Sequence, residues 1–91
     1  MTKHFNITIS GLVQGVFFRD GAKEIADKIG VFGFVQNTDA GTVYVEVEGE
    51  EKKLEEFIAW CHTGPKLARV EKVEITEGPL SHFTHFEVRF S

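Results

Sequence analysis

A nine-residue run, GLVQGVFFR from Gly11 to Arg19, has the residue types of an anion-binding loop. Its two glycines permit backbone conformations that side chains disfavour, and the run leads into an amphipathic, helix-like segment. A loop at a helix start directs several N–H groups and the positive end of the helix dipole toward one point. Arg19 adds a permanent, forked cation that can bind two phosphate oxygens. These features indicate a site for a phosphoryl group.

The same run is also consistent with a glycine-containing turn whose arginine makes a surface ion pair. It is not a nucleotide-binding P-loop, because the GK[ST] ending is missing. It is not the loop of a cysteine phosphatase either, since that loop needs a cysteine six positions before the arginine and Val13 stands there. The loop therefore offers no covalent nucleophile.

The elements around this loop follow from hydrophobic periodicity. Strand-like alternation covers residues 4–10, 31–37, 43–48, 69–77 and about 83–90, and helical spacing covers 18–29 and 50–62. The order β-α-β-β-α-β plus a terminal strand predicts an α+β, ferredoxin-like sandwich. Its antiparallel sheet would carry two helices on one face and leave the other face largely exposed.

Several core assignments accompany this fold. In the fourth strand we expect Val73 and Ile75 to point inward, with a bulge near Val70. Cys61 falls on the apolar stripe of the second helix and is predicted to be a core residue, whereas Trp60 lies off that stripe and is predicted to pack at its flank. In the terminal strand, one face is expected to carry three apolar residues: Phe86, Val88 and Phe90.

Composition limits the classes of function. The chain has 91 residues, enough for one domain, and 42% of them are hydrophobic. A net charge of −4 argues against a general binder of nucleic acid or anionic membranes. The single cysteine excludes an intramolecular disulfide, and no signal-like segment is visible, so we expect a soluble, cytoplasmic monomer.

The expected topology brings a second polar residue to the loop. In this fold the third strand lies between the first and second, antiparallel to both, so the end of the second strand is level with the end of the first. Asn37 would then lie at the sheet edge that carries the loop ending at Arg19. The alternative is an asparagine that caps its own turn, which is common before a Thr-Asp-x-Gly sequence.

The motifs resemble those of the acylphosphatases. GLVQGVFFR is followed, after a helix, by GFVQN (Gly33 to Asn37) and TDAGTV, and later by GPKLARVEKVEI (Gly64 to Ile75). The resemblance spans nearly the whole chain. The one visible variation is Phe34, where many members of the family carry tryptophan.

The resemblance implies hydrolysis of a carboxyl–phosphate anhydride to a carboxylate and inorganic phosphate, by direct attack of water, without metal, cofactor or covalent intermediate. Asn37 would position the water. The phosphate would be held by the Arg19 side chain and by the loop amides of Gln14, Gly15, Val16, Phe17, Phe18 and Arg19. The partners implied are a small acyl phosphate, and inorganic phosphate as product and inhibitor, with no nucleic acid or membrane.

Other functions fit the sequence less well. An RNA-binding sheet needs exposed aromatic residues and a basic surface, but the third strand offers only Tyr44, flanked by Glu46 and Glu48. A regulatory domain that binds a small anion without turnover, or a carbamoyl-phosphate-handling domain of a larger maturation protein, remains an alternative. His82 and His85 would point to opposite faces of a strand, which makes them a poor metal-binding pair.

Overall fold

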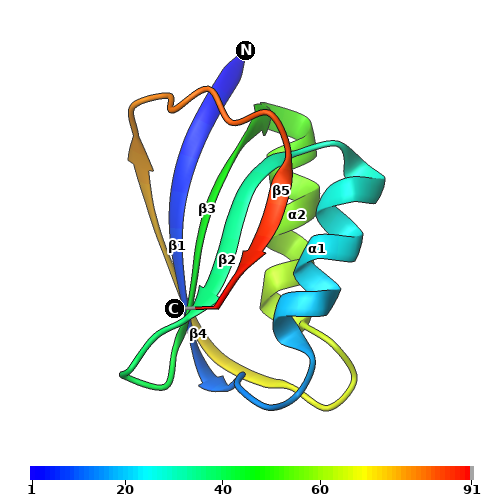
Figure 1. Ribbon diagram of the computed structural model, residues 1–91, viewed down its shortest axis with the longest axis vertical. Coiled ribbons are helices and arrows are strands. Elements are labelled where there is room, and N and C mark those ends of the chain that lie inside the picture. The colour runs from blue at the N-terminus through cyan, green and yellow to red at the C-terminus, as the bar shows by residue number, and fades with distance from the viewer. Residues whose placement is uncertain (91) are drawn as a thin grey trace.

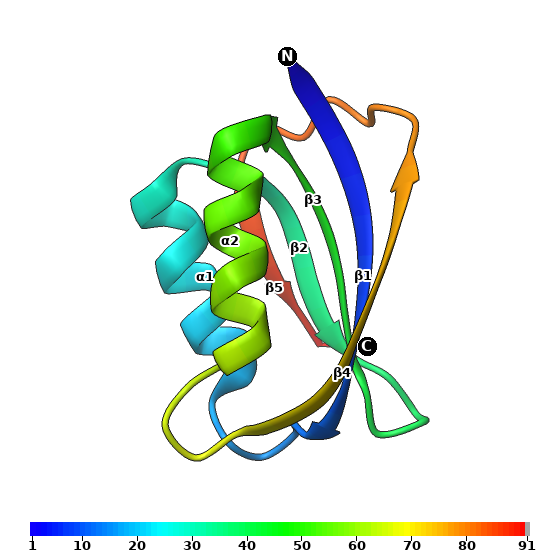
Figure 2. The same ribbon diagram turned by 180° about the vertical axis from the view of Figure 1, so that it is seen from behind.

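Two helices lie side by side on one face of a five-stranded sheet in the computed structural model, which describes residues 1–90 (Figure 1). Viewed from behind, the helices cover the same face and leave the other face without a helical layer (Figure 2). Along the chain the elements are β1 (Thr2–Leu12), α1 (Phe18–Ile29), β2 (Phe32–Asn37), β3 (Val43–Glu50), α2 (Glu51–Thr63), β4 (Arg69–Gly78) and β5 (Phe86–Arg89). The predicted ferredoxin-like α+β fold is confirmed.

The sheet order is β4-β1-β3-β2-β5. β3 pairs antiparallel with both β1 and β2, as expected, and β4 pairs antiparallel with β1. The terminal strand departs from the prediction, because β5 pairs parallel with β2 and makes the sheet mixed rather than antiparallel. Residues 79–85 cross from the end of β4 to the opposite edge, so β5 starts at the same end of the sheet as β2 (Figure 1).

The core lies between the sheet and the two helices. β1 contributes Ile7 and Ile9, and β3 contributes three fully buried valines. The helix layer adds Phe18, Ala22 and Ala26 from α1, and Leu54, Phe57 and Cys61 from α2. Cys61 is confirmed as a core residue, and its burial raises the pKa of the thiol.

Trp60 packs where the two helices meet. Its ring lies 5.1 Å from the Phe18 ring, and a Cβ added at Gly21 would stand 2.8 Å from the Trp60 ring. A glycine in the first turn of a helix costs helix propensity, but here it gives the neighbouring indole room. The predicted flank-packing role of Trp60 is confirmed.

The edge strand β4 follows its predicted orientation but is partly exposed. The bulge is present, since the β1–β4 register shifts between Ser10 and Gly11, which pair with Lys72 and Val70. Val73 packs against the core. Ile75 lies on the inward face as predicted, because it pairs with the fully buried Ile7, but it is 38% exposed. This end of β4 lies away from both helices in the two views, so nothing in the helix layer covers it (Figures 1 and 2).

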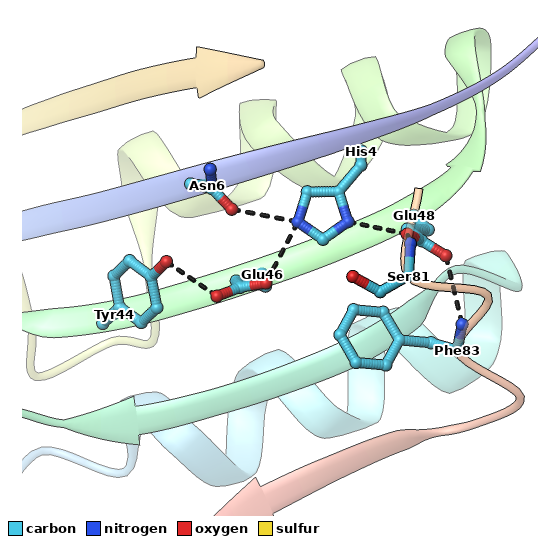
Figure 3. Close-up of polar contacts among 7 residues, drawn as sticks. All are labelled: His4, Asn6, Tyr44, Glu46, Glu48, Ser81 and Phe83. Atoms are coloured by element: carbon cyan, nitrogen blue, oxygen red, sulfur yellow. Dashed lines mark hydrogen bonds and ion pairs between the residues drawn. The ribbon is translucent and has the colours of Figure 1, made fainter. Parts of the chain in front are cut away.

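The face without helices is not open along its whole length. At the end where β1 begins, His4, Phe34 and Glu48 are at most 6% exposed, so the expectation of a largely exposed face is wrong there. The cause is the crossing segment, residues 79–85, whose Ser81 and Phe83 N–H groups donate to the Glu48 carboxylate (Figure 3).

β5 begins at Phe86, later than the expected start at about residue 83. Phe86 pairs with Gly33 in the parallel register, so residue 83 would lie beyond the start of β2 at Phe32. Residues 1–90 contain no helix that is long and apolar enough to span a membrane.

Candidate functional site

Apolar side chains of the loop between β1 and α1 anchor it to the core. Val13, Val16 and Phe18 are at most 7% exposed and pack into the core. Between them, Gly15 has a left-handed backbone with φ of 75°. A Cβ at Gly15 would meet nothing within 4 Å, so glycine suits this position through its backbone conformation rather than through lack of space.

The N–H groups of this loop are free of backbone partners. The first bond of α1 runs from the Gly21 N–H to the Phe17 carbonyl, at 3.0 Å. Within residues 1–90, the N–H groups of Gly15 to Arg19 donate to no backbone carbonyl in a helix, strand or turn. Such groups at a helix start carry partial positive charge and can bind an anion.

Arg19 and Asn37 line the same cavity. Its volume is about 280 Å³, and its walls are formed by Val13, Gly15, Phe17, Phe18, Arg19, Asp20 and Asn37. Five of the predicted site residues are therefore brought together: Gly15, Phe17, Phe18, Arg19 and Asn37. The two others have side chains directed elsewhere, because Val16 is buried in the core and Gln14 contacts the β2–β3 turn.

Sheet register explains how Asn37 reaches this cavity. Val43 at the start of β3 pairs with Ile9 on one side and Asn37 on the other, so the end of β2 is level with the last part of β1. Side chains alternate along a strand, and Val35 belongs to the helix-covered core. Asn37, two residues later, therefore lies on the face that carries the loop and α1.

The Gln14 side chain ties the loop to the hairpin. Its amide nitrogen donates to the carbonyls of Thr38 and Thr42, both at 2.9 Å. This bridge fixes the distance between the loop and the residue just before Thr38, which is Asn37. From the sequence, only the backbone N–H of Gln14 was expected to contribute to the site. A long amide side chain between buried valines in a loop is the signal that points to such a bridge.

Phe90 is a second residue that sequence analysis placed differently. It was expected on an apolar face, but it lies beyond the end of β5 and is 78% exposed. The Arg19 guanidinium lies over its ring, 4.6 Å from the centroid. Because β5 runs parallel to β2 and Arg89 pairs with Gln36, the following residue arrives beside the cavity. A cation over an aromatic ring is attracted by the ring face, and this contact orients the guanidinium.

Arg19 brings a positive charge to the cavity. Within residues 1–90, no carboxylate lies within ion-pair distance of its guanidinium. Asp20 is exposed in the first turn of α1 and lines the cavity. The site thus combines backbone N–H groups, one guanidinium and one carboxamide. Such groups are suited to binding a phosphoryl group and to orienting a water molecule beside it.

Comparisons with known proteins agree with this geometry. The acylphosphatase family model matches residues 5–88. An acylphosphatase from Rubrobacter xylanophilus is 48% identical over 89 residues, which cover 97% of this chain and 81% of the relative. The crystal structure of acylphosphatase from Bacillus subtilis matches with a TM-score of 0.93 at 32% identity, over 98% of this chain and 99% of that one.

The same fold also occurs inside a larger protein. A structure of full-length HypF, in a phosphate- and nucleotide-bound form, matches with a TM-score of 0.87 at 32% identity. The match covers 98% of this chain but 12% of the HypF chain. With the family model spanning nearly all described residues and relatives of similar length, the chain belongs to the acylphosphatase family.

Proposed function

We propose that this chain hydrolyses acyl phosphates to a carboxylate and inorganic phosphate. The observation that carries the proposal is that Arg19 and Asn37 line one and the same cavity. Family membership supports the reaction class, and the relatives reported above are themselves named acylphosphatases. Inorganic phosphate, which presents the same oxygens to the loop as the substrate, acts as a product inhibitor.

The phosphoryl end of the substrate occupies the loop. Its equatorial oxygens accept hydrogen bonds from the N–H groups between Gln14 and Arg19 and from the guanidinium. Phosphoryl transfer through a loose transition state mainly requires positioning and stabilisation of these oxygens. One well-placed donor to a developing oxyanion contributes roughly 3–4 kcal/mol in comparable sites. The leaving group is a stabilised carboxylate, so the site needs no strong general acid.

Asn37 orients the attacking water. A carboxamide both donates and accepts hydrogen bonds, so it can hold a water molecule in line with the bond that breaks. The benefit is orientation, which lowers the entropic part of the barrier. Water attacks phosphorus directly, the P–O bond to the acyl group breaks, and a substrate phosphate oxygen accepts the proton. No protein nucleophile and no metal take part.

Isotope labelling tests the bond that breaks and the absence of an intermediate. Hydrolysis of benzoyl phosphate in ¹⁸O-labelled water, with a chelator present, is expected to place the label in phosphate and not in benzoate. Acid-quenched reactions with ³²P-labelled substrate are expected to leave no label on the protein. Label in benzoate, a trapped phosphoprotein, or turnover that requires added metal would contradict the mechanism.

The role of Asn37 is tested by Asn37→Ala. We expect kcat to fall by about 10²-fold, the loss typical of a misplaced reacting group, while the inhibition constant of inorganic phosphate changes little. Wild-type kcat in this variant would refute the assigned role. A wild-type protein that binds phosphate but never hydrolyses acyl phosphates would instead indicate an anion-binding module.

A further inference from the structure

Phe17 occupies a backbone conformation that favours glycine. Its φ is 67° and its ψ is 25°, and Gly15, two residues earlier, has a similar φ of 75°. Left-handed conformations are disfavoured for residues with a Cβ, and bulky side chains are uncommon there. Within residues 1–90 the other such non-glycine residue is His82, far from this loop.

The phenyl ring of Phe17 gains little from the fold in return. The residue is 69% exposed, whereas its neighbours Val16 and Phe18 are at most 7% exposed. Phe17 stands at the N-cap of α1 and makes no side-chain capping bond. Glycine or asparagine would suit both the backbone and the cap better. Disfavoured backbone geometry that packing does not require is concentrated at functional sites.

The place of Phe17 in the cavity wall indicates what it can contact. Val13 and Phe18 are buried, whereas Phe17 is exposed and also lines the cavity, so Phe17 belongs to the mouth of the cavity. A phosphoryl group bound to the loop N–H groups leaves its acyl substituent directed toward that mouth.

We infer that the Phe17 ring binds the acyl part of the substrate and selects substrates with aromatic or large apolar acyl groups. This inference rests on the proposed function for the identity of the bound group. The ring offers an exposed, flat apolar surface on which another ring stacks, and such aromatic pairs are favourable beyond the area they bury. Small acyl groups such as acetyl are too short to use it fully.

Substrate pairs test the inference. The ratio of kcat/KM for benzoyl phosphate to kcat/KM for acetyl phosphate is measured in wild type, Phe17→Asn and Phe17→Tyr. Asparagine tolerates the left-handed backbone but removes the ring, and tyrosine keeps the ring. We expect the ratio to fall roughly 3- to 10-fold in Phe17→Asn, as the loss of one aromatic contact predicts, and to be retained in Phe17→Tyr.

Three controls separate this effect from a disturbed loop. The inhibition constant of inorganic phosphate, which has no acyl group, should stay near the wild-type value in Phe17→Asn. Phe17→Gly should reproduce the altered ratio if the asparagine variant does not fold. Phe32→Asn removes a phenylalanine that is 42% exposed at the other end of β2, and it should leave the ratio unchanged.

A binding measurement keeps this inference distinct from the proposed function. Calorimetry with the non-hydrolysable benzoylphosphonate and acetylphosphonate should show the same loss of preference in Phe17→Asn, whether or not the protein turns over substrate. If wild type does not hydrolyse acyl phosphates but prefers benzoylphosphonate, and Phe17→Asn loses that preference, the proposed function is contradicted and the role of Phe17 is upheld. An unchanged ratio in both assays, or an equal loss in Phe17→Tyr, would overturn it.

Discussion

Polar side chains gather at both ends of the sheet, but their bonding partners differ. At the end where β1 begins, the His4 ring donates to Glu48 at 2.7 Å, and its other nitrogen faces Asn6 at 2.9 Å and Glu46 at 3.1 Å (Figure 3). At the end where β1 stops, Arg19 and Asn37 face a cavity of about 280 Å³. Among residues 1–90, charged groups at the His4 end pair with one another, whereas the loop end lines a cavity with a guanidinium and a carboxamide.

The difference follows from what covers each end. The crossing segment, residues 79–85, lies over the His4 end, and its Phe83 ring stacks on the His4 ring with centroids 5.8 Å apart. Buried charges require such partners, because an unpaired charge away from water is costly. At the loop end the described residues instead form a cavity whose wall includes Gly15 and Arg19. We therefore expect changes at the loop end to affect catalysis and changes at the His4 end to affect stability.

The largest effect is expected for Arg19→Ala. Removing the guanidinium takes away a charged donor to the transferred phosphoryl group, and kcat/KM for an acyl phosphate should fall about 10²–10³-fold, with inhibition by phosphate lost. The matched control is Arg89→Ala, because Arg89 also lies over an aromatic ring, that of Phe34, at 3.7 Å. Arg89 does not line the cavity, and its loss should leave steady-state kinetics unchanged. Equal losses in both variants would contradict the specific role assigned to the Arg19 guanidinium.

Glu48→Ala should mainly reduce stability. Its carboxylate is 4% exposed and accepts bonds from His4 and from the Ser81 and Phe83 N–H groups. Breaking a buried pair by removing one partner costs about 3 kcal/mol or more, which urea denaturation would measure.

The control for this variant is a glutamate on the surface of the same sheet. Glu74 in β4 forms an exposed pair with Lys72, and Glu74→Ala should change the free energy of unfolding little. If Glu48→Ala lowers kcat at temperatures where it is fully folded, the two ends are coupled and the comparison fails.

Gln14→Ala should affect both properties to a smaller extent. The variant loses two hydrogen bonds to the carbonyls of Thr38 and Thr42, which should cost about 1–2 kcal/mol of stability. Because the bridge holds the turn after Asn37 against the loop, kcat should fall as well, by about 10-fold. Gln36→Ala, a glutamine one residue before Asn37, is the control. A normal kcat in Gln14→Ala would show that the loop and the hairpin keep their positions without the bridge.

The smallest effect concerns pH. Burial alone would lower the pKa of His4, but bonds to Glu48 and Asn6 and the charges of Glu48 and Glu46 outweigh it and raise the pKa above its ordinary value of 6.5. Burial alone would raise the pKa of Glu48, but the Ser81 N–H, His4 and the Phe83 N–H lower it below 4.5.

The signs of these shifts define a window of greatest stability. A raised histidine pKa gives stability that is fully present below pH 6.5 and is lost as pH rises through the folded value. A lowered carboxyl pKa gives stability that is present above pH 4.5 and is lost as pH falls through the folded value. The ion pair between His4 and Glu48 should therefore contribute most to stability between pH 4.5 and pH 6.5. When the pH is raised from 5.5 to 8, the urea concentration at the unfolding midpoint should fall more in wild type than in His4→Gln. Equal changes in the two proteins would refute the linkage.

Local patterns were sufficient to predict most of the elements and the loop that joins β1 to α1. Alternation in β1 and β3, helical spacing from Phe18 to Ile29, and the glycines before Arg19 are properties of neighbouring residues, so they can be read without coordinates. The pairing of β3 between β1 and β2 followed from element order, and it correctly brought Asn37 to the level of the loop.

Contacts between residues distant in sequence were decided by the tertiary structure alone. The alternation that starts at about residue 83 does not reveal the path of residues 79–85. That path depends on Glu48, more than thirty residues earlier, which accepts the Ser81 and Phe83 N–H groups. That path makes β5 parallel to β2 and carries Phe90 under Arg19. The sequence by itself determined which groups could bind a phosphoryl oxygen. The packed chain determined which of them share a cavity, because side-chain direction and long-range pairing depend on contacts that no local pattern contains.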